Sequence, residues 1–134
     1  MNPPSEDIKD ILIDSSVALG EFAATSGWSI NISKMPDSPD TCIGIYDQPG
    51  LASEPKITYD RPGLQIIVRG AKNAYLAGYS KAKDIMRALH GRNNESWNDT
   101  RYLQILAESD IIQMGRDDND RPLFSINFLI HRIG

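Results

Sequence analysis

The sequence predicts an α+β fold in which two helices pack against a mostly antiparallel sheet, in the order α-β-β-β-α-β-β-β. Two segments repeat apolar residues at three- and four-residue steps, as amphipathic helices do, and six shorter segments alternate or cluster apolar residues as strands do. The strands come in two groups of three, without the regular strand-helix alternation of a parallel doubly wound sheet. A length of 134 residues is that of one ordinary domain, so we expect a single domain over residues 1–134.

The first helix is expected to begin near Ser5 and to run to about Ser26. Ser5 can cap the N-terminus, Glu6 and Asp7 lie where the helix dipole favours acids, and Gly27 suits the end of the helix. Its apolar face comprises Ile8, Ile11, Leu12, Leu19, Phe22 and Ala23. This face is expected to pack on a core.

Two strands are expected next. Residues 28–33 alternate apolar and polar side chains up to a breaker run at residues 35–39, and residues 42–47 form a second apolar segment. Residues 48–63 then contain three prolines and two glycines, which is too many for the inside of a regular element. We predict a projecting loop or extended arm there.

A third strand is expected over residues 64–69, followed by a second helix that is capped near Asn73 and closed by Gly91. The predicted buried stripe of this helix comprises Tyr75, Leu76, Tyr79, Ala82, Met86 and Leu89. A polar loop should follow it.

Three further strands are expected over residues 102–107, 111–116 and 123–130, the last two joined across the turn 117–120. Alternation divides the last strand into two faces. The face expected to meet the helices carries Phe124, Ile126, Phe128 and Ile130, and the other face carries Ser125, Asn127 and His131.

The net charge of -4 disfavours tight binding to DNA, because such binding depends on Lys and Arg that displace phosphate counterions. The charge is uneven along the chain. Residues 1–60 hold three basic and ten acidic side chains, a net of -7, whereas residues 61–134 hold eleven and eight, a net of +3. Complementary halves suit head-to-tail association of copies, although a chance imbalance between two solvated surfaces explains the same counts.

No segment approaches the roughly 20 apolar residues that span a bilayer, and the N-terminal MNPPSED carries no export signal. We therefore expect a cytosolic chain with no membrane partner. Cys42 is the only cysteine, which excludes an internal disulfide. The possible metal ligands Cys42, His90 and His131 are far apart, and neither a nucleophile elbow nor a glycine-rich phosphate motif is present. We expect no metal, no cofactor and no enzymatic activity.

The acids Asp117, Asp118 and Asp120 suggest a calcium loop only superficially, because Arg121 and a proline follow in place of the expected glycine. A hairpin turn explains them better, since Asp and Asn tolerate turn geometry. The flanking Arg116 and Arg121 either neutralise these acids locally or reach a neighbouring subunit, and we favour the local salt bridge.

Three stretches of the sequence are informative together: LQIIVRG at residues 64–70, the helix with Tyr75 and Tyr79 that ends in LHG at 89–91, and GRDDNDRPLFSINF at 115–128. Together they resemble phage minor capsid proteins of the tail-terminator type. The resemblance covers about residues 42–133. It implies a six-membered ring that binds the end of the tail tube protein, stops its polymerisation and presents a surface to the head connector protein.

The same resemblance implies that DNA passes through the ring without specific binding, and that the protein belongs to the virion tail after assembly in the host bacterial cytoplasm. The residues expected at a subunit or tube interface are Asp47, Arg61, Arg69, Arg116, Asp117, Asp118 and Arg121. The residues expected to line the hole are Asp37, Asp40, Asp47, Glu54 and Asp60.

Two alternatives stay open from the sequence. One is another neck component, such as a head-completion protein, which has similar size and composition. The other is a small enzyme or ligand-binding domain whose pocket would be lined by Gln65, Arg69, Asn127 and His131, if these share one sheet face.

Overall fold

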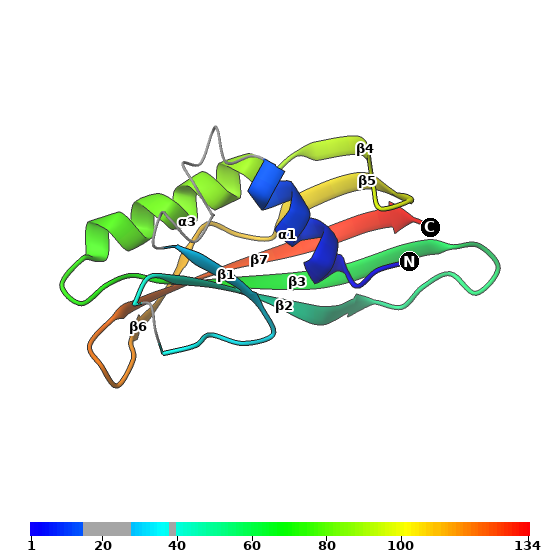
Figure 1. Ribbon diagram of the computed structural model, residues 1–134. Coiled ribbons are helices and arrows are strands. Elements are labelled where there is room, and N and C mark those ends of the chain that lie inside the picture. Colours follow the sequence, from blue (N-terminus) through cyan, green and yellow to red (C-terminus); the bar gives the residue numbers. More distant parts are fainter. Residues whose placement is uncertain (15–27, 38–39) are drawn as a thin grey trace.

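Seven strands form one sheet, and two helices lie over one of its faces in the computed structural model, which describes residues 1–14, 28–37 and 40–134 (Figure 1). The strand order is β1-β2-β3-β7-β5-β4, and β6 pairs with β7 beyond that path. Among the strands that the structure describes, β1 and β2 form the one parallel pair. In chain order the elements are α1 (Pro4–Asp14), β1 (Ser29–Ile32), β2 (Cys42–Leu51), β3 (Tyr59–Arg69), α3 (Tyr75–Leu89), β4 (Arg92–Trp97), β5 (Thr100–Ala107), β6 (Ile112–Arg116) and β7 (Pro122–Ile133). The predicted α+β class is confirmed, with one strand more than expected.

The core lies between the helices and the sheet, as the apolar periodicity predicts. On α1 the buried apolar residues are Ile8, Ile11 and Leu12. On β7 all four alternating residues from Phe124 to Ile130 are fully buried, which confirms the face assigned to them. The positions Leu19, Phe22, Ala23 and Gly27 of the predicted first helix lie outside the described residues.

The buried stripe predicted for α3 is partly wrong. Tyr75 is 43% and Leu76 75% exposed, while Gly78 and Ile85 face the sheet. The reason is the close approach at Gly78, where an added Cβ would lie 2.8 Å from the ring of Phe124. A large side chain cannot occupy the contact between helix and strand there, so the inward stripe runs through positions 78, 82, 85 and 89.

The N-terminus of α3 also differs from the prediction, whereas its C-terminus agrees with it. Its N-cap is Ala74, with no side-chain cap, while Asn73 adopts a positive φ of 61° in the preceding turn. Gly91 follows the helix with a φ of +86°, a conformation that glycine adopts without steric cost, and so ends the helix as predicted.

A polar loop was expected after α3, but residues 92–97 form strand β4. It pairs antiparallel with β5 through a two-residue turn at Asn98 and Asp99, whose φ angles are +51° and +63°. Positive φ at both central residues is the type I′ geometry that suits the twist of a hairpin. As an edge strand with half-exposed side chains, β4 lacks the apolar alternation by which strands are recognised.

The segment 48–63, called the arm from here on, is a β-hairpin extension and not a loop. Strand β2 continues to Leu51 and β3 begins at Tyr59, which leaves a short tip at residues 52–58. The register shifts between Gln48 and Leu51, so Pro49 and Gly50 lie in a bulge where no regular ladder partner is needed. In Figure 1 the arm runs out past both chain termini.

Candidate functional site

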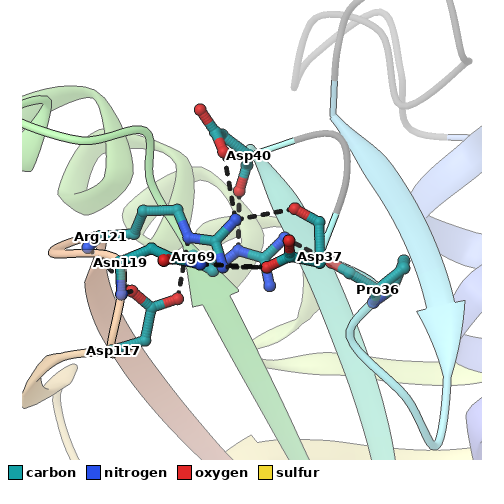
Figure 2. A network of polar contacts seen from close by, with 7 residues as sticks. All are labelled: Pro36, Asp37, Asp40, Arg69, Asp117, Asn119 and Arg121. Carbon is teal, nitrogen blue, oxygen red and sulfur yellow. Dashed lines mark hydrogen bonds and ion pairs between the residues drawn. The ribbon is translucent and has the colours of Figure 1, made fainter.

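Arg121 at the start of β7 forms the centre of a charged cluster at one end of the sheet (Figure 2). Its side chain is only 6% exposed. The guanidinium donates to the carboxylates of Asp37 at 2.8 Å, Asp40 at 3.1 Å and Asp117 at 2.8 Å, and to the backbone carbonyl of Asp37 at 2.8 Å. We call these four residues the Arg121 cluster. It joins the β6–β7 turn to the segment that precedes β2.

The turn between β6 and β7 is built by the acids, as expected. One oxygen of Asp117 accepts the backbone N–H groups of Asn119 at 3.0 Å and Arg121 at 2.9 Å. Asp120 adopts a φ of +62°, and its carboxylate pairs with Arg116 at 3.0 Å. The predicted local salt bridges of both flanking arginines are therefore confirmed.

The surroundings of Asp117 and Arg121 change the pKa of both. Burial raises the pKa of Asp117, but hydrogen bonds from the backbone and side chain of Arg121 and from Asn119 outweigh burial, so the pKa lies below its ordinary value. Burial lowers the pKa of Arg121, and its bonds to Asp37, Asp117 and Asp40 outweigh that effect and raise it. Asp117 and Arg121 are therefore both ionised at neutral pH.

Arg69 at the end of β3 holds the same segment from a second direction. Its Nε donates to the carbonyl of Asp40 at 2.8 Å and its Nη2 to the carbonyl of Pro36 at 2.5 Å. The residue is 4% exposed. Two buried arginines from neighbouring strands thus bind Pro36, Asp37 and Asp40, which lie ahead of β2 in the chain (Figure 2).

The arm carries its own set of polar contacts. Arg61 donates to the carbonyl of Ala52 at 2.8 Å and lies 3.7 Å from the carboxylate of Glu54. Asp60 accepts a hydrogen bond from Ser53 across the tip and pairs with Arg132 of β7 at 3.2 Å. The bond from Ser53, followed by those from Arg132, holds the pKa of Asp60 below its ordinary value against the opposing effect of burial. These contacts join the two strands of the arm to each other and β3 to β7.

A buried network that sequence reasoning missed links α1 to the sheet near the arm. Asp7, fully buried, accepts hydrogen bonds from the hydroxyl of Tyr102 and from Asn98 at 2.6 Å. Arg132 donates to Tyr102 at 3.3 Å and to the carbonyl of Asn2 at 2.8 Å. The sequence contained a signal for this network, because Asp7 adjoins Ile8 on the apolar side of α1 and an acid there needs a partner. The position of Asp7 in the first turn of the helix suggested an interaction with the helix dipole instead.

Asp47 caps α1 from strand β2. Its carboxylate accepts the backbone N–H of Ser5 at 2.9 Å and the hydroxyl of Ser5 at 2.7 Å. Ser5, expected to cap the helix with its own side chain, is instead inside α1 and is held by a residue 42 positions away. A helix N-terminus favours such a carboxylate partner.

The candidate residues predicted from sequence therefore fall into three places. At the β6–β7 end lie Asp37, Asp40, Arg69, Arg116, Asp117, Asp118 and Arg121. In the arm lie Glu54, Asp60 and Arg61. Asp47 belongs to β2, and its carboxylate lies beside the N-terminus of α1. The first two groups are at opposite ends of the sheet (Figure 1).

Of the four polar residues considered for a ligand pocket, Gln65 and Asn127 are cross-strand partners, whereas Arg69 and His131 lie four residues farther along their strands in opposite directions. Gln65 donates to Ser125 at 3.1 Å, Arg69 binds the segment before β2, and the ring of His131 lies 2.5 Å from the hydroxyl of Tyr59. Asn127 lines a shallow groove beside the bulge of the arm. Gln65, Arg69 and His131 are each engaged by a neighbouring protein group, so the sheet face does not present them together to a small molecule.

The donors considered for a metal are likewise engaged elsewhere. Nδ1 of His90 accepts the backbone N–H of Ala107 at 2.9 Å, and Cys42 is fully buried. Within residues 1–14, 28–37 and 40–134, no three His, Cys, Asp or Glu side chains are grouped so as to hold a metal ion. None of the helices in that part of the chain has the length and apolar character to cross a membrane.

Comparison with known proteins identifies a matching family and similar solved structures. A family model described as bacteriophage tail terminator protein matches residues 13–132. A chain in the solved structure titled "Virion of native gene transfer agent (GTA) particle" superposes with a TM-score of 0.75, over 97% of this chain and 94% of that one. The two sequences are 14% identical, so this likeness shows a shared fold. No curated protein matches the chain by sequence.

Proposed function

The chain belongs to the bacteriophage tail terminator family, and from this premise we propose that it forms a ring that caps the tail tube, stops tube polymerisation and offers a surface for head attachment. Membership of the family makes it a structural component of the virion tail and not an enzyme. The match over residues 13–132 is the observation that carries the proposal, because it includes every strand of the sheet and helix α3.

The ring would consist of six copies, each acting as a single domain, which is the stoichiometry that the sequence resemblance implies. Its support in the fold is the separation of two charged groups, one at the β6–β7 end and one in the arm (Figure 1). Two different surfaces on one chain allow a head-to-tail contact, and such a contact closes into a ring when the rotation between copies permits.

The hole of this ring would carry negative charge. Six copies at -4 bring about 24 formal negative charges, and a negative wall allows DNA to slide because it does not bind phosphates. Asp37 and Asp40 are the first candidates, since their side chains are 82% and 61% exposed although both bond to Arg121. Asp47, Glu54 and Asp60 are further candidates whose carboxylates already serve the fold.

The partners would be the tail tube protein on one side of the ring and the head connector protein on the other, with DNA passing between them. The interface candidates Arg116 and Asp118 support this reading, because both are exposed at the turn between β6 and β7. Asp117, Arg69 and Arg121 would act by holding that turn and the segment before β2 in place.

The experiment is to add the purified chain to growing tail tubes and to image the tubes by negative staining. The expected result is an annulus at tube ends and an arrest of tube growth at sub-stoichiometric amounts of the chain. Native mass measurement should give a species of six times 14.9 kDa, about 89 kDa. Unaltered growth without annuli would reject the proposal, and binding to filled heads but not to tubes would indicate a head-completion protein instead.

A further inference from the structure

We propose that the arm of one copy docks on strand β6 of the next copy, with Leu51 and Ile57 of the arm packing against Ile112 and Met114. The inference rests on the proposed ring and names the contact that would close it. The partner is therefore a second copy of this chain.

The arm offers apolar side chains on a prearranged support. The arm extends beyond the part of the sheet that the helices cover (Figure 1), and it exposes Leu51 at 50% and Ile57 at 60%. The hydrogen bond from Arg61 to Ala52 and the pairing of Asp60 with Arg132 hold the two strands of the arm in place. A surface that is ordered before binding loses little conformational entropy on association, which favours docking.

Strand β6 offers the matching surface at the other end of the sheet. All five of its residues are exposed, including Ile112 at 43% and Met114 at 44%. Among the described strands only β7 pairs with β6, so its outer edge has unpaired backbone groups. An exposed apolar edge strand is a site of association unless something covers it.

The register shows which face β6 presents. Ile112 pairs with Ser125, which alternates with Phe124 and therefore lies on the face away from the helices. Ile67 of β3 pairs with the same Ser125. Ile112 and Ile67 thus flank one position of β7 on the helix-free face, where a neighbouring arm can be received without displacing either helix.

A second copy is the occupant that the geometry favours. The arm and β6 lie at opposite ends of one chain, so a chain cannot bring its own two surfaces together (Figure 1). The exposed Lys56 at the tip of the arm and the exposed Asp118 in the turn after β6 can form one opposite-charge pair across this contact. Each copy would give one arm and receive another, which is the head-to-tail relation that a ring requires.

Disulfide trapping tests the contact. A variant with both Ile57→Cys and Met114→Cys, oxidised under ring-forming conditions with and without tail tubes, should give a ladder of linked species up to the full ring on a non-reducing gel. A mixture of the two single variants should stop at linked dimers, because each chain then has one reactive end. The native Cys42 is buried and does not compete.

A matched control places the second cysteine elsewhere. Leu76→Cys combined with Ile57→Cys should remain unlinked, since Leu76 is 75% exposed on α3 and lies outside the contact. Ile57→Ser should also raise the concentration at which half of the chains are in rings by about tenfold, whereas Leu76→Ser should not change it.

The outcomes separate the two proposals. Rings of normal mass without the ladder, or a ladder of equal strength from the Leu76 control, would overturn the arm contact and leave the ring intact. Absence of rings both alone and on tube ends would overturn the ring, and the arm contact with it.

Discussion

The guanidinium of Arg121 lies 2.8 Å from the carboxylate of Asp37, although the two residues are 84 positions apart in the chain. This pair connects the turn of the last hairpin to the segment that enters β2 (Figure 2). The consequence is that the β6–β7 turn is joined to Asp37, which lies ahead of β2, by an ion pair between residues far apart in the chain.

The first prediction concerns this connection. Arg121→Ala should lower the free energy of unfolding by about 1 to 3 kcal/mol, because it removes a buried cation that bonds three carboxylates. Arg116→Ala is the matched control. Its side chain is 56% exposed and its one partner is also half-exposed, so the loss should be below about 1 kcal/mol. Urea denaturation of both variants measures the difference, and equal losses would contradict a special role of Arg121.

The second prediction is a loss of stability in acid. The pKa of Asp117 in the folded chain lies below its ordinary value of about 3.9, so its contribution is fully present above that pH and is lost as the pH falls through the folded-state pKa. The melting temperature should therefore fall steeply below about pH 4. Asp117→Asn should show a lower melting temperature at pH 7 and a shallower fall in acid.

The control for the acid experiment is Asp118→Asn. Asp118 is exposed in the same turn, and no hydrogen bond or ion pair joins it to the residues that the structure describes. Its acid dependence should match that of the unmodified chain. An unchanged slope in Asp117→Asn would show that other carboxylates govern the acid transition.

The sequence predicts those strands whose side chains alternate between a buried and a less buried face. Strand β7 was located by alternation, since Phe124 and Phe128 point into the core and their neighbours do not. Strand β4 was missed because its residues show no apolar alternation. As an edge strand it is held by backbone pairing with β5 and by the turn at Asn98 and Asp99. The local partner of Arg121, Asp117, was within reach of sequence reasoning.

The long-range partners of Arg121 could not be predicted from the sequence. The pairing of Arg121 with Asp37 and Asp40 depends on the fold bringing the entry to β2 beside the β6–β7 turn, and spacing in the chain does not encode that neighbourhood. The arm was half predicted for a similar reason. Its prolines indicated an irregular segment, but a bulge accommodates Pro49, so the strands continue through it.

The third prediction separates core from surface on one helix–strand contact. Phe124→Ala should cost about 3 to 5 kcal/mol, because the fully buried ring packs edge-on against Tyr75 and Tyr79 of α3 and its removal leaves a cavity in the core. Leu76→Ala, on the exposed side of the same helix, should change stability by less than about 0.5 kcal/mol. Chemical denaturation measures both, and a large loss in Leu76→Ala would mean that another part of the chain covers this position.

The fourth prediction concerns the buried hydroxyl of Tyr102. Burial and the bond to Asp7 raise the pKa of Tyr102, so the hydroxyl stays protonated and donates to the Asp7 carboxylate. Tyr102→Phe leaves that carboxylate buried with one donor fewer and should cost about 1 to 3 kcal/mol. Tyr75→Phe, at a ring that is 43% exposed, should be nearly neutral. Melting curves that coincide for the two variants would show that the hydrogen bond from Tyr102 to Asp7 does not contribute to the stability of the fold.

The last prediction addresses the hole of the proposed ring, and it requires substitutions that keep Arg121 bound. Asp37→Asn and Asp40→Asn together serve this purpose, because an amide oxygen still accepts the hydrogen bonds that Arg121 donates over 2.8 and 3.1 Å. Lysine at either position would instead place a second cation beside Arg121 and destabilise the fold. A change in DNA release could then not be assigned to the charge of the wall alone.

Six copies of the double variant would carry about 12 formal negative charges in place of about 24, and a less negative wall repels DNA less. Tails assembled with this variant should cap tubes normally but release DNA more slowly, with the defect larger at low salt because added ions screen the field. DNA release followed by a dye at several salt concentrations measures this. Equal release rates at all salt concentrations, with rings confirmed by mass, would exclude Asp37 and Asp40 from the wall of the hole.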